Sequence, residues 1–375
     1  MPALLDTVDP DGLLEFSVVF TDRSLNHMSA AFQGVMRDIS TILKDVYKAE
    51  AVALIPGGGT YAMEAVARQL ATGQKAMVIR NGWFSYRWTQ IFEAGDIPSE
   101  EIVMKARRAG NAIDAPFAPA PIEEVTARIA AERPNVVFAP HVETSAGLIL
   151  PDDYLRAVAD AVHEVGGLFV LDCIASGCAW VDMKATGVDV LISAPQKGWS
   201  ASPSAGLVMM SEAGRARVKE TQSTSFAVDL GKWLSIMEAY EAGGHAYHAT
   251  MPTDALKGFR DTMLEMQEMG FAALAEAQWE QGRRVRAALA ARGVKSVAAD
   301  GFGAPGVVVC YTDTPEIQTG KAFVAQGMQI AAGVPLMCDE GPDYKSFRLG
   351  LFGLDKLKDV DASVARLETA LDAVL

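Results

Sequence analysis

The sequence predicts an α/β protein whose larger part is a mainly parallel sheet covered by helices on both faces. Three observations carry this prediction. About seven short apolar runs alternate with helix-like segments between residues 51 and 210. The runs are almost continuously apolar, which is typical of strands buried on both faces. Beyond about residue 225 helices predominate, which indicates a second, smaller α+β lobe.

The first elements set up this alternation. Residues 16–20 form an extended apolar run that ends in a polar turn, and from Met28 apolar residues recur at spacings of three and four, which predicts a helix to Val46. We then expect strands at residues 51–55, 75–80, 102–105, 136–140, 168–172, 188–192 and 207–210. Helices are expected between them, at residues 60–70, 83–92, 121–131 and 152–165.

The last third of the chain has a different pattern. Helices are expected at residues 228–240 and 253–289, the second long enough to bridge two lobes, followed by strands at 306–311, 328–331 and 347–351 and a final helix at 360–375. We place the domain boundary near residue 260. The expected division is an N-terminal segment 1–30, a large domain 31–260 and a small C-terminal domain 261–375.

Composition excludes several classes of function. The 33 basic and 47 acidic residues give a formal charge of −14 with no basic block, which argues against a nucleic-acid partner. No apolar run approaches the length of a membrane helix, and the N-terminus carries acids where a signal peptide would carry bases, so we expect a cytoplasmic protein. The four cysteines lack CxxC spacing and coupled histidines, which predicts buried thiols and no metal site.

A single lysine, Lys197, stands in the polar, Gly/Pro/Ser-rich crossing between the apolar runs 188–192 and 206–210. A buried charge is unfavourable unless it is paired or neutralised. A lysine at the mouth of a buried strand therefore has either a solvent exit or a chemical role. Its position alone leaves both readings open, including an ordinary lysine on an exposed loop.

Other polar groups follow the expected strands at the edge where open parallel sheets bind ligands. Gly57–Thr60 precedes a helix, where free N–H groups favour an anion, although a structural turn has the same composition. It is not a dinucleotide fingerprint, because position 62 is Ala. Asp172 ends one strand and Lys197 follows the next. Asp172 alone could be a helix cap.

Two further segments complete this edge. His141–Gly147 carries a carboxylate and a hydroxyl, and Asn81–Phe84 carries an aromatic ring. This edge thus combines a turn that can bind phosphate, a flat aromatic ring, a carboxylate, a hydroxyl and a lysine. These are the groups needed to hold a phosphorylated pyridine and bind its aldehyde covalently.

The chain resembles a known family over about residues 45–365: the class V aminotransferases among the fold type I pyridoxal-phosphate enzymes, in the alanine–glyoxylate and serine–pyruvate branch. Several separated motifs agree in order. They are Pro56–Ala65, Asn81–Phe84, Glu143–Thr144, Leu171–Ser176, Gln196–Lys197, Tyr247–Pro252 and Phe347–Gly353. The resemblance implies a fold type I pyridoxal-phosphate-dependent transferase, with a mainly parallel seven-stranded sheet in the large domain.

The resemblance also implies a role for each motif. Lys197 would be the Schiff-base lysine and Asp172 the partner of the pyridine nitrogen. The cofactor-binding set would be Gly58, Gly59, Thr60, Phe84, Thr144, Asp172, Gln196 and Lys197, with Tyr247 and Thr250 reaching the phosphate from a neighbouring subunit. Arg348 would bind the substrate carboxylate through its forked guanidinium. The expected assembly is therefore a homodimer with composite active sites.

The implied function is transfer of an amino group from a small 2-amino acid to a 2-oxo acid, with glyoxylate or pyruvate expected. A pyridoxal-phosphate lyase on the same fold is the alternative, although cysteine desulfurases resemble one another in carrying histidines where this chain has Gln196 and Phe84. A non-catalytic α/β protein that binds a phosphorylated ligand is the remaining alternative.

The chain departs from the family pattern at two places. Residues 16–27 stand where the family usually has a Pro-Gly-Pro turn beside the substrate pocket. Arg23 or His27 could reach a second polar group of the substrate from there, and a surface or core role fits either residue as well. Gly58 stands where relatives often carry Ser, which leaves more of the phosphate binding to backbone amides.

Overall fold

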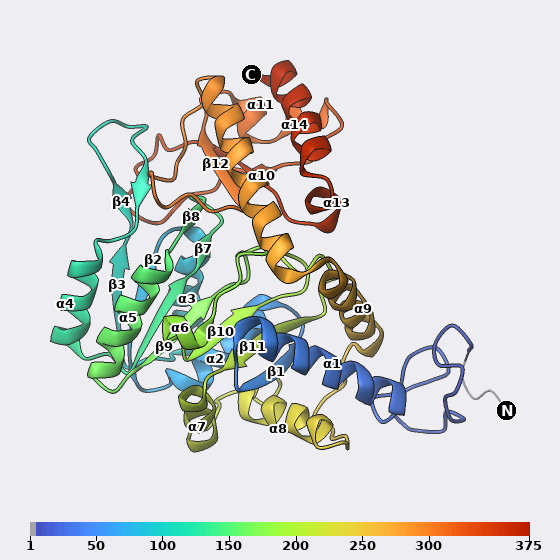
Figure 1. Cartoon of the computed structure of the whole chain (residues 1–375). Helices are drawn as coiled ribbons and strands as arrows, with labels where there is room; N and C mark the ends of the chain where they lie inside the picture. Colours follow the sequence, from blue (N-terminus) through green and yellow to red (C-terminus); the bar gives the residue numbers. More distant parts are fainter. Residues whose placement is uncertain (1–4) are drawn as a thin grey trace.

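The computed structural model describes residues 5–375, so Met1 to Leu4 of the expected N-terminal segment lie outside the described residues. Figure 1 shows a large lobe around the central sheet, a smaller lobe above it, and an N-terminal arm that extends away from both. None of the helices in residues 5–375 combines the length and the apolar character that crossing a membrane requires.

The central sheet has seven strands in the order β1-β11-β10-β9-β6-β2-β3. Its strands are β1 (Ala51–Pro56), β2 (Lys75–Arg80), β3 (Glu100–Lys105), β6 (Val136–Pro140), β9 (Leu168–Asp172), β10 (Val190–Ser193) and β11 (Ala205–Met210). Strands β3, β2, β6, β9 and β10 pair in parallel, and β11 is antiparallel to both β10 and β1. The carboxyl end of β1 therefore lies at the same edge as those of the parallel strands. The mainly parallel seven-stranded sheet is confirmed.

Helices cover both faces of this sheet, with α4 and α5 in front and α3 behind in Figure 1. They are α1 (Ala30–Tyr47), α2 (Gly59–Leu70), α3 (Trp83–Gly95), α4 (Ile122–Glu132), α5 (Asp152–Glu164), α6 (Met183–Thr186), α7 (Glu212–Glu220) and α8 (Leu230–Glu241). Short two-stranded pairs at the edge are β4 (Arg107–Arg108) with β5 (Phe117–Ala118), and β7 (Val142–Glu143) with β8 (Leu148–Ile149). Strands covered on both faces need continuous apolar runs, and β1, β6, β9 and β11 have them.

The smaller lobe is built on a three-stranded antiparallel sheet in the order β12-β14-β13. Its elements are α10 (Phe271–Ala291), β12 (Val307–Tyr311), α11 (Pro315–Gln318), α12 (Lys321–Val324), β13 (Ala331–Ala332), β14 (Ser346–Gly350), α13 (Leu354–Leu357) and α14 (Val360–Val374). Helix α9 (Thr253–Met269) leads into it from the large lobe. In Figure 1, α10 runs from the junction with α9 up the side of this lobe.

Trp199 fixes the loop that carries Lys197. This indole is fully buried, and its ring centre lies 4.9 Å from that of Trp180 and 5.9 Å from that of Phe259. Aromatic clusters of this kind bury large apolar areas and hold their members in one geometry. The segment after β10 is therefore anchored two residues beyond the lysine.

Two expectations about elements were wrong. The single helix expected over residues 253–289 is two helices, because Gly270 adopts φ 87° between α9 and α10 and breaks the hydrogen-bond ladder. The apolar run at residues 16–20 lies outside the strands, with Phe16 89% exposed and Val18 102% exposed. The strand expected at 328–331 is reduced to Ala331–Ala332.

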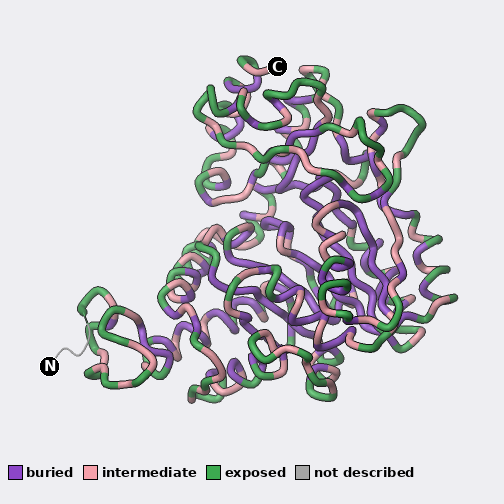
Figure 2. The backbone as a smooth tube through the Cα atoms, turned by 180° about the vertical axis from the view of Figure 1, so that it is seen from behind, coloured by how far each residue is buried: buried purple, intermediate pink, exposed green. Residues whose placement is uncertain are grey.

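The buried backbone in Figure 2 follows the central sheet, whereas the arm is mostly exposed or intermediate. Residue 260, near which the domain boundary was expected, lies inside α9. The division into residues 1–30, 31–260 and 261–375 stays a prediction.

Candidate active site

The loops that carry Asp172 and Lys197 touch each other at the edge of the sheet. Strands β9 and β10 pair in parallel with Ile192 opposite Asp172, so the segments after them leave the sheet side by side. A Cβ atom on Gly198 would lie 2.1 Å from the carbonyl oxygen of Gly177. Only glycine allows this approach. The two predicted catalytic side chains are thereby brought to one place.

Asp172 is a buried carboxylate in an unfavourable environment. The N–H of Ile174 donates a 2.9 Å hydrogen bond to its Oδ1. The pKa of Asp172 is raised to about 7, mainly by burial and also by the nearby Glu143 carboxylate, against the opposing effects of the Ile174 N–H and the charges of Arg87 and Lys197. A cation bound beside this carboxyl group would lower its pKa and favour the ionised form.

Lys197 has the character of a reactive amine. Burial lowers the pKa of Lys197, the Arg348 guanidinium lowers it further, and Asp172 opposes both. Its Nζ lies 5.4 Å from the ring centre of Phe352, and within residues 5–375 it makes no ion pair. A lysine with a lowered pKa has more of the neutral form that attacks a carbonyl carbon.

Arg348 brings the small lobe to this site. Arg348 lies on β14, and its Nε donates a 2.8 Å hydrogen bond to the carbonyl of Ala332 on the neighbouring β13. Its guanidinium carbon lies 5.4 Å from the ring centre of Phe84 at the start of α3. The arginine, the aromatic ring and the lysine thus face one another across the two lobes.

Glu143 is the group that positions Phe84. This fully buried carboxylate accepts hydrogen bonds from the N–H groups of Phe84 (3.2 Å) and Ser85 (2.9 Å). The hydroxyls of Ser85 and Ser145 each donate a further 2.7 Å bond to it, and the N–H of Ser145 donates one of 3.0 Å. A carboxylate at a helix N-terminus also interacts favourably with the helix dipole. These hydrogen bonds fix the first turn of α3 and, with it, the position of Phe84.

The glycine turn after β1 forms the N-terminus of α2. Gly58 is the N-cap in extended conformation, and a Cβ there would meet nothing within 4 Å, so open space faces the turn. A Cβ on Gly59 would lie 2.4 Å from Cδ1 of Ile174, which packs the turn against the Asp172 loop. Thr60 accepts a 3.1 Å hydrogen bond from Nη1 of Arg87. The unpaired N–H groups of α2 therefore open toward space beside Asp172.

Tyr247 and Thr250 do not join this group in the same chain. Their hydroxyls lie 3.2 Å apart, and the Tyr247 ring centre lies 5.4 Å from that of His27. His27 is buried against Phe20, His245 and Tyr247. Arg23 is exposed next to Asp22. No hydrogen bond or ring contact within residues 5–375 links these arm residues to Lys197, so a substrate role for Arg23 or His27 stays a prediction.

Of the remaining predicted residues, Thr144 is buried beside Glu143, and Gln196 is exposed next to Lys197. Sequence reasoning missed the roles of Glu143, Arg87 and Phe352. The spacing of three between Phe84 and Arg87 was an available signal, because residues three apart on a helix share a face. The contact of Phe352 with Lys197 had no local signal, since it joins two lobes.

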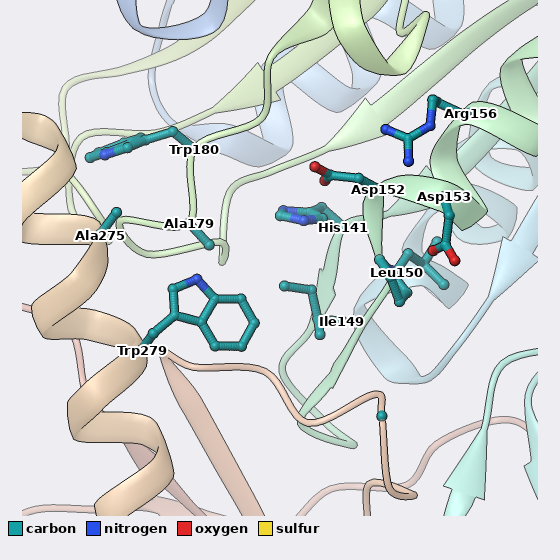
Figure 3. Close-up of a pocket in the computed structure, with 12 residues that line it drawn as sticks. His141, Ile149, Leu150, Asp152, Asp153, Arg156, Ala179, Trp180, Ala275 and Trp279 are labelled. Carbon is teal, nitrogen blue, oxygen red and sulfur yellow. The ribbon is translucent and has the colours of Figure 1, made fainter.

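A separate cavity of about 570 Å³ opens behind the strand ends (Figure 3). Its walls include His141, Trp180 and Trp279, and neither Lys197 nor Asp172 lines it. Burial lowers the pKa of His141 to about 4, so its ring is neutral, and its Nδ1 lies 2.7 Å from the hydroxyl of Ser176. This pair supports the Asp172 loop from the far side.

The seven-stranded, mainly parallel sheet with its smaller α+β lobe is the fold of the type I pyridoxal-phosphate enzymes. The family model for class-V aminotransferases matches residues 17–301, and the chain belongs to this family. It is a pyridoxal-phosphate-dependent transaminase.

Individual relatives are similar to this chain over most of their length. A protein of Anabaena cylindrica named soluble hydrogenase 42 kDa subunit is 26% identical over 355 residues, which cover 92% of this chain and 87% of that one. Alanine–glyoxylate aminotransferase 1 of Saccharomyces cerevisiae is 24% identical, with 88% and 86% covered. The crystal structure of an alanine–glyoxylate aminotransferase from Nostoc sp. superposes with a TM-score of 0.78 at 22% identity, covering 93% and 89%.

The residues present fit pyridoxal phosphate. Among residues 5–375, the buried Asp172 carboxyl group with its raised pKa has no cationic partner at ion-pair distance, and a protonated pyridine nitrogen would supply one. Open space faces Gly58 at a helix N-terminus, which suits a phosphate. An amine with a lowered pKa lies near that carboxyl group and suits an aldehyde.

We predict that Glu143→Gln lowers the free energy of unfolding by about 2–3 kcal/mol, because either orientation of the amide places its NH₂ against a backbone N–H of α3 or of Ser145. Urea unfolding followed by circular dichroism measures the change. In the matched control, Glu124→Gln removes an exposed ion pair with Arg107 and should change stability by less than about 1 kcal/mol. Equal stability of the two variants would contradict the buried role.

Asp172 should make the stability of the cofactor-free protein depend on pH. Its carboxyl titrates near 3.8 when unfolded and near 7 when folded, so its contribution is fully present below pH 4 and is lost as pH rises toward 7. The stability of Asp172→Asn relative to the wild type should therefore rise through this window, by on the order of 4 kcal/mol at most. Urea unfolding between pH 5 and pH 8 measures the difference; a difference independent of pH would refute the prediction.

Proposed function

We propose that this transaminase moves an amino group from a small 2-amino acid to glyoxylate or pyruvate, with Lys197 and Asp172 as its catalytic residues. The observation that carries the proposal is the meeting of Lys197, whose pKa is lowered, with Asp172 and with Arg348 of the other lobe. The names of the yeast and Nostoc relatives support glyoxylate as the acceptor.

Pyridoxal phosphate, when bound, supplies an aldehyde that takes up the amino group and a ring that withdraws electrons. In the proposed site Gly58, Gly59 and Thr60 at the start of α2 would hold the phosphate. Phe84, the hydroxyl of Thr144 and the amide of Gln196 would hold the ring. Asp172 holds a positive charge on the ring nitrogen, which in turn keeps this carboxylate ionised at neutral pH.

Lys197 moves the proton. In its neutral form, Nζ of Lys197 would accept a proton from the substrate carbon and then donate it to the cofactor. The lowered pKa of Lys197 makes both transfers accessible near neutral pH. The amine lies over the ring face of Phe352. No carboxylate of residues 5–375 lies at ion-pair distance from it. The amine is therefore free to move between proton donor and acceptor.

Arg348 binds the substrate carboxylate. The carbonyl of Ala332 uses its Nε, so the two terminal nitrogens remain for a forked pair of hydrogen bonds. Burial lowers the pKa of Arg348, but a guanidinium keeps its charge at any physiological pH. The proposed site therefore selects substrates that carry a carboxylate next to the reacting carbon.

The cysteines argue against the lyase alternative of the desulfurase type. Burial raises the pKa of Cys178, Cys310 and Cys338 to about 12, and that of Cys173 well above its usual range. Desulfurase chemistry needs a reactive thiolate near the cofactor. None of the four thiols meets that requirement.

We further propose that the active form is a homodimer with composite sites. Tyr247 is 53% exposed, and on the arm Leu13, Phe16 and Val18 are 88%, 89% and 102% exposed. Exposed apolar side chains clustered on an extended segment favour an interface. A second copy is the proposed occupant, because Tyr247 and Thr250 make no contact with the site of their own chain, and the partner's phosphate would use them.

Lys197→Ala should abolish turnover of alanine or serine with glyoxylate or pyruvate, by about 10²- to 10⁴-fold or more. Borohydride treatment of the wild type with pyridoxal phosphate should attach a pyridoxyl group to Lys197, seen by peptide mass mapping. Lys184→Ala removes only an exposed ion pair with Glu50 and should retain both properties. Label on another lysine, or no keto product from any donor, would reject the proposed site.

Subunit exchange tests the composite site. Lys197→Ala and Tyr247→Ala dimers should each be nearly inactive, and a mixed dimer would contain one intact site and one doubly altered site. Equal mixing with exchange in mild denaturant should therefore restore about a quarter of wild-type activity. The same mixture without exchange is the control. No recovery, with exchange verified by mass spectrometry, would show that each site is built from one chain.

A further inference from the structure

Arg87 links the aromatic ring at the start of α3 to the glycine turn of α2. Its Nη1 donates a 3.1 Å hydrogen bond to the hydroxyl of Thr60. Its guanidinium carbon lies 5.3 Å from the ring centre of Phe84, one helical turn earlier on α3. The side chain therefore lies beside both groups expected to bind the cofactor.

Within residues 5–375, Arg87 has no carboxylate at ion-pair distance. Arg68, on the neighbouring α2, is by contrast paired with Glu64 at 2.7 Å. A guanidinium carries five N–H donors, and the Thr60 hydroxyl uses one of those on Arg87. Arg87 is half-buried and its bond to Thr60 is open to solvent, so its remaining donors and its charge are accessible to an anion.

The neighbours of Arg87 indicate where an anion would bind. Thr60 is the second residue of α2, whose free N–H groups attract negative charge, and open space faces Gly58 beside it. Gly58 offers no hydroxyl to an anion. Partial charges of backbone amides alone balance a phosphate dianion poorly, and a full positive charge from Arg87 would complete the site.

Arg87 also lies within electrostatic reach of the reacting groups. Its charge lowers the pKa of Asp172 and contributes to the lowered pKa of Lys197. An anion bound at Arg87 would screen both effects.

We propose that Arg87 binds the phosphate of pyridoxal phosphate, together with the Thr60 hydroxyl and the N-terminus of α2. This proposal rests on the cofactor site proposed above. Arg87 is a cofactor-binding residue on this view and takes no part in proton transfer. A substrate carboxylate is the competing anion for the same guanidinium, and the experiment separates the two.

The test compares pyridoxal phosphate with pyridoxal, which lacks the phosphate. In full-length protein stripped of cofactor, Arg87→Gln should weaken binding of pyridoxal phosphate by about 10- to 100-fold, because one charge-assisted interaction is lost. Binding of pyridoxal should not change. Arg87→Lys should recover part of the loss, because it restores the charge without the fork. Arg156→Gln, an exposed arginine on α5, is the matched control and should alter neither affinity.

Two outcomes would overturn the proposal. Equal weakening of both ligands by Arg87→Gln would assign Arg87 a structural role. A higher KM for the amino or keto acid, with the preference for pyridoxal phosphate over pyridoxal unchanged, would assign it to the substrate carboxylate. Borohydride labelling of Lys197 with saturating pyridoxal should persist in Arg87→Gln, so failure of this proposal is distinguishable from failure of the Lys197 site.

Discussion

The close contact between the backbones of Gly177 and Gly198 is the constraint on which the site depends. Parallel pairing of β9 and β10 aligns the strand ends, but side chains on the two loops would hold those loops apart. The missing side chain of Gly198 removes that obstacle, and the buried Trp199 fixes the loop in place. Asp172 and Lys197 can then influence each other's pKa in a medium from which water is largely excluded.

A second layer of interactions holds the groups that surround this pair. Glu143 fixes the first turn of α3, Ile174 joins the Asp172 loop to the turn of α2, and β13 orients Arg348. The Glu143 support is a buried hydrogen bond, that of Ile174 a close packing contact, and that of β13 a hydrogen bond at the surface. A transaminase must position a ring, a carboxylate and an amine together, and rigid supports reduce the entropy lost when substrate binds.

Most of the large lobe could be predicted from the sequence because its strands are short, apolar and separated by clear turns. The same reasoning placed Asp172 and Lys197 on one edge, since strand ends are a local property that the sheet then aligns. It failed where tertiary context decides: Gly270 splits one amphipathic pattern into two helices, and the strand expected at residues 328–331 is reduced to Ala331–Ala332. The bonds of Glu143 to α3 and of Arg87 to Thr60 escaped it because they join elements more than twenty residues apart in the chain.

The distribution of charge explains how an acidic protein can host an anionic cofactor and anionic substrates. The chain carries a net charge of −14, yet Lys197, Arg348 and Arg87 gather at one edge against the buried Asp172. The negative charge of Glu143 is compensated by the five hydrogen bonds that its carboxylate accepts. Cations in a partly buried site act over a lower dielectric than the exposed acids outside, whose field is screened by salt. The local field therefore favours phosphate and carboxylate, while the acidic surface maintains solubility.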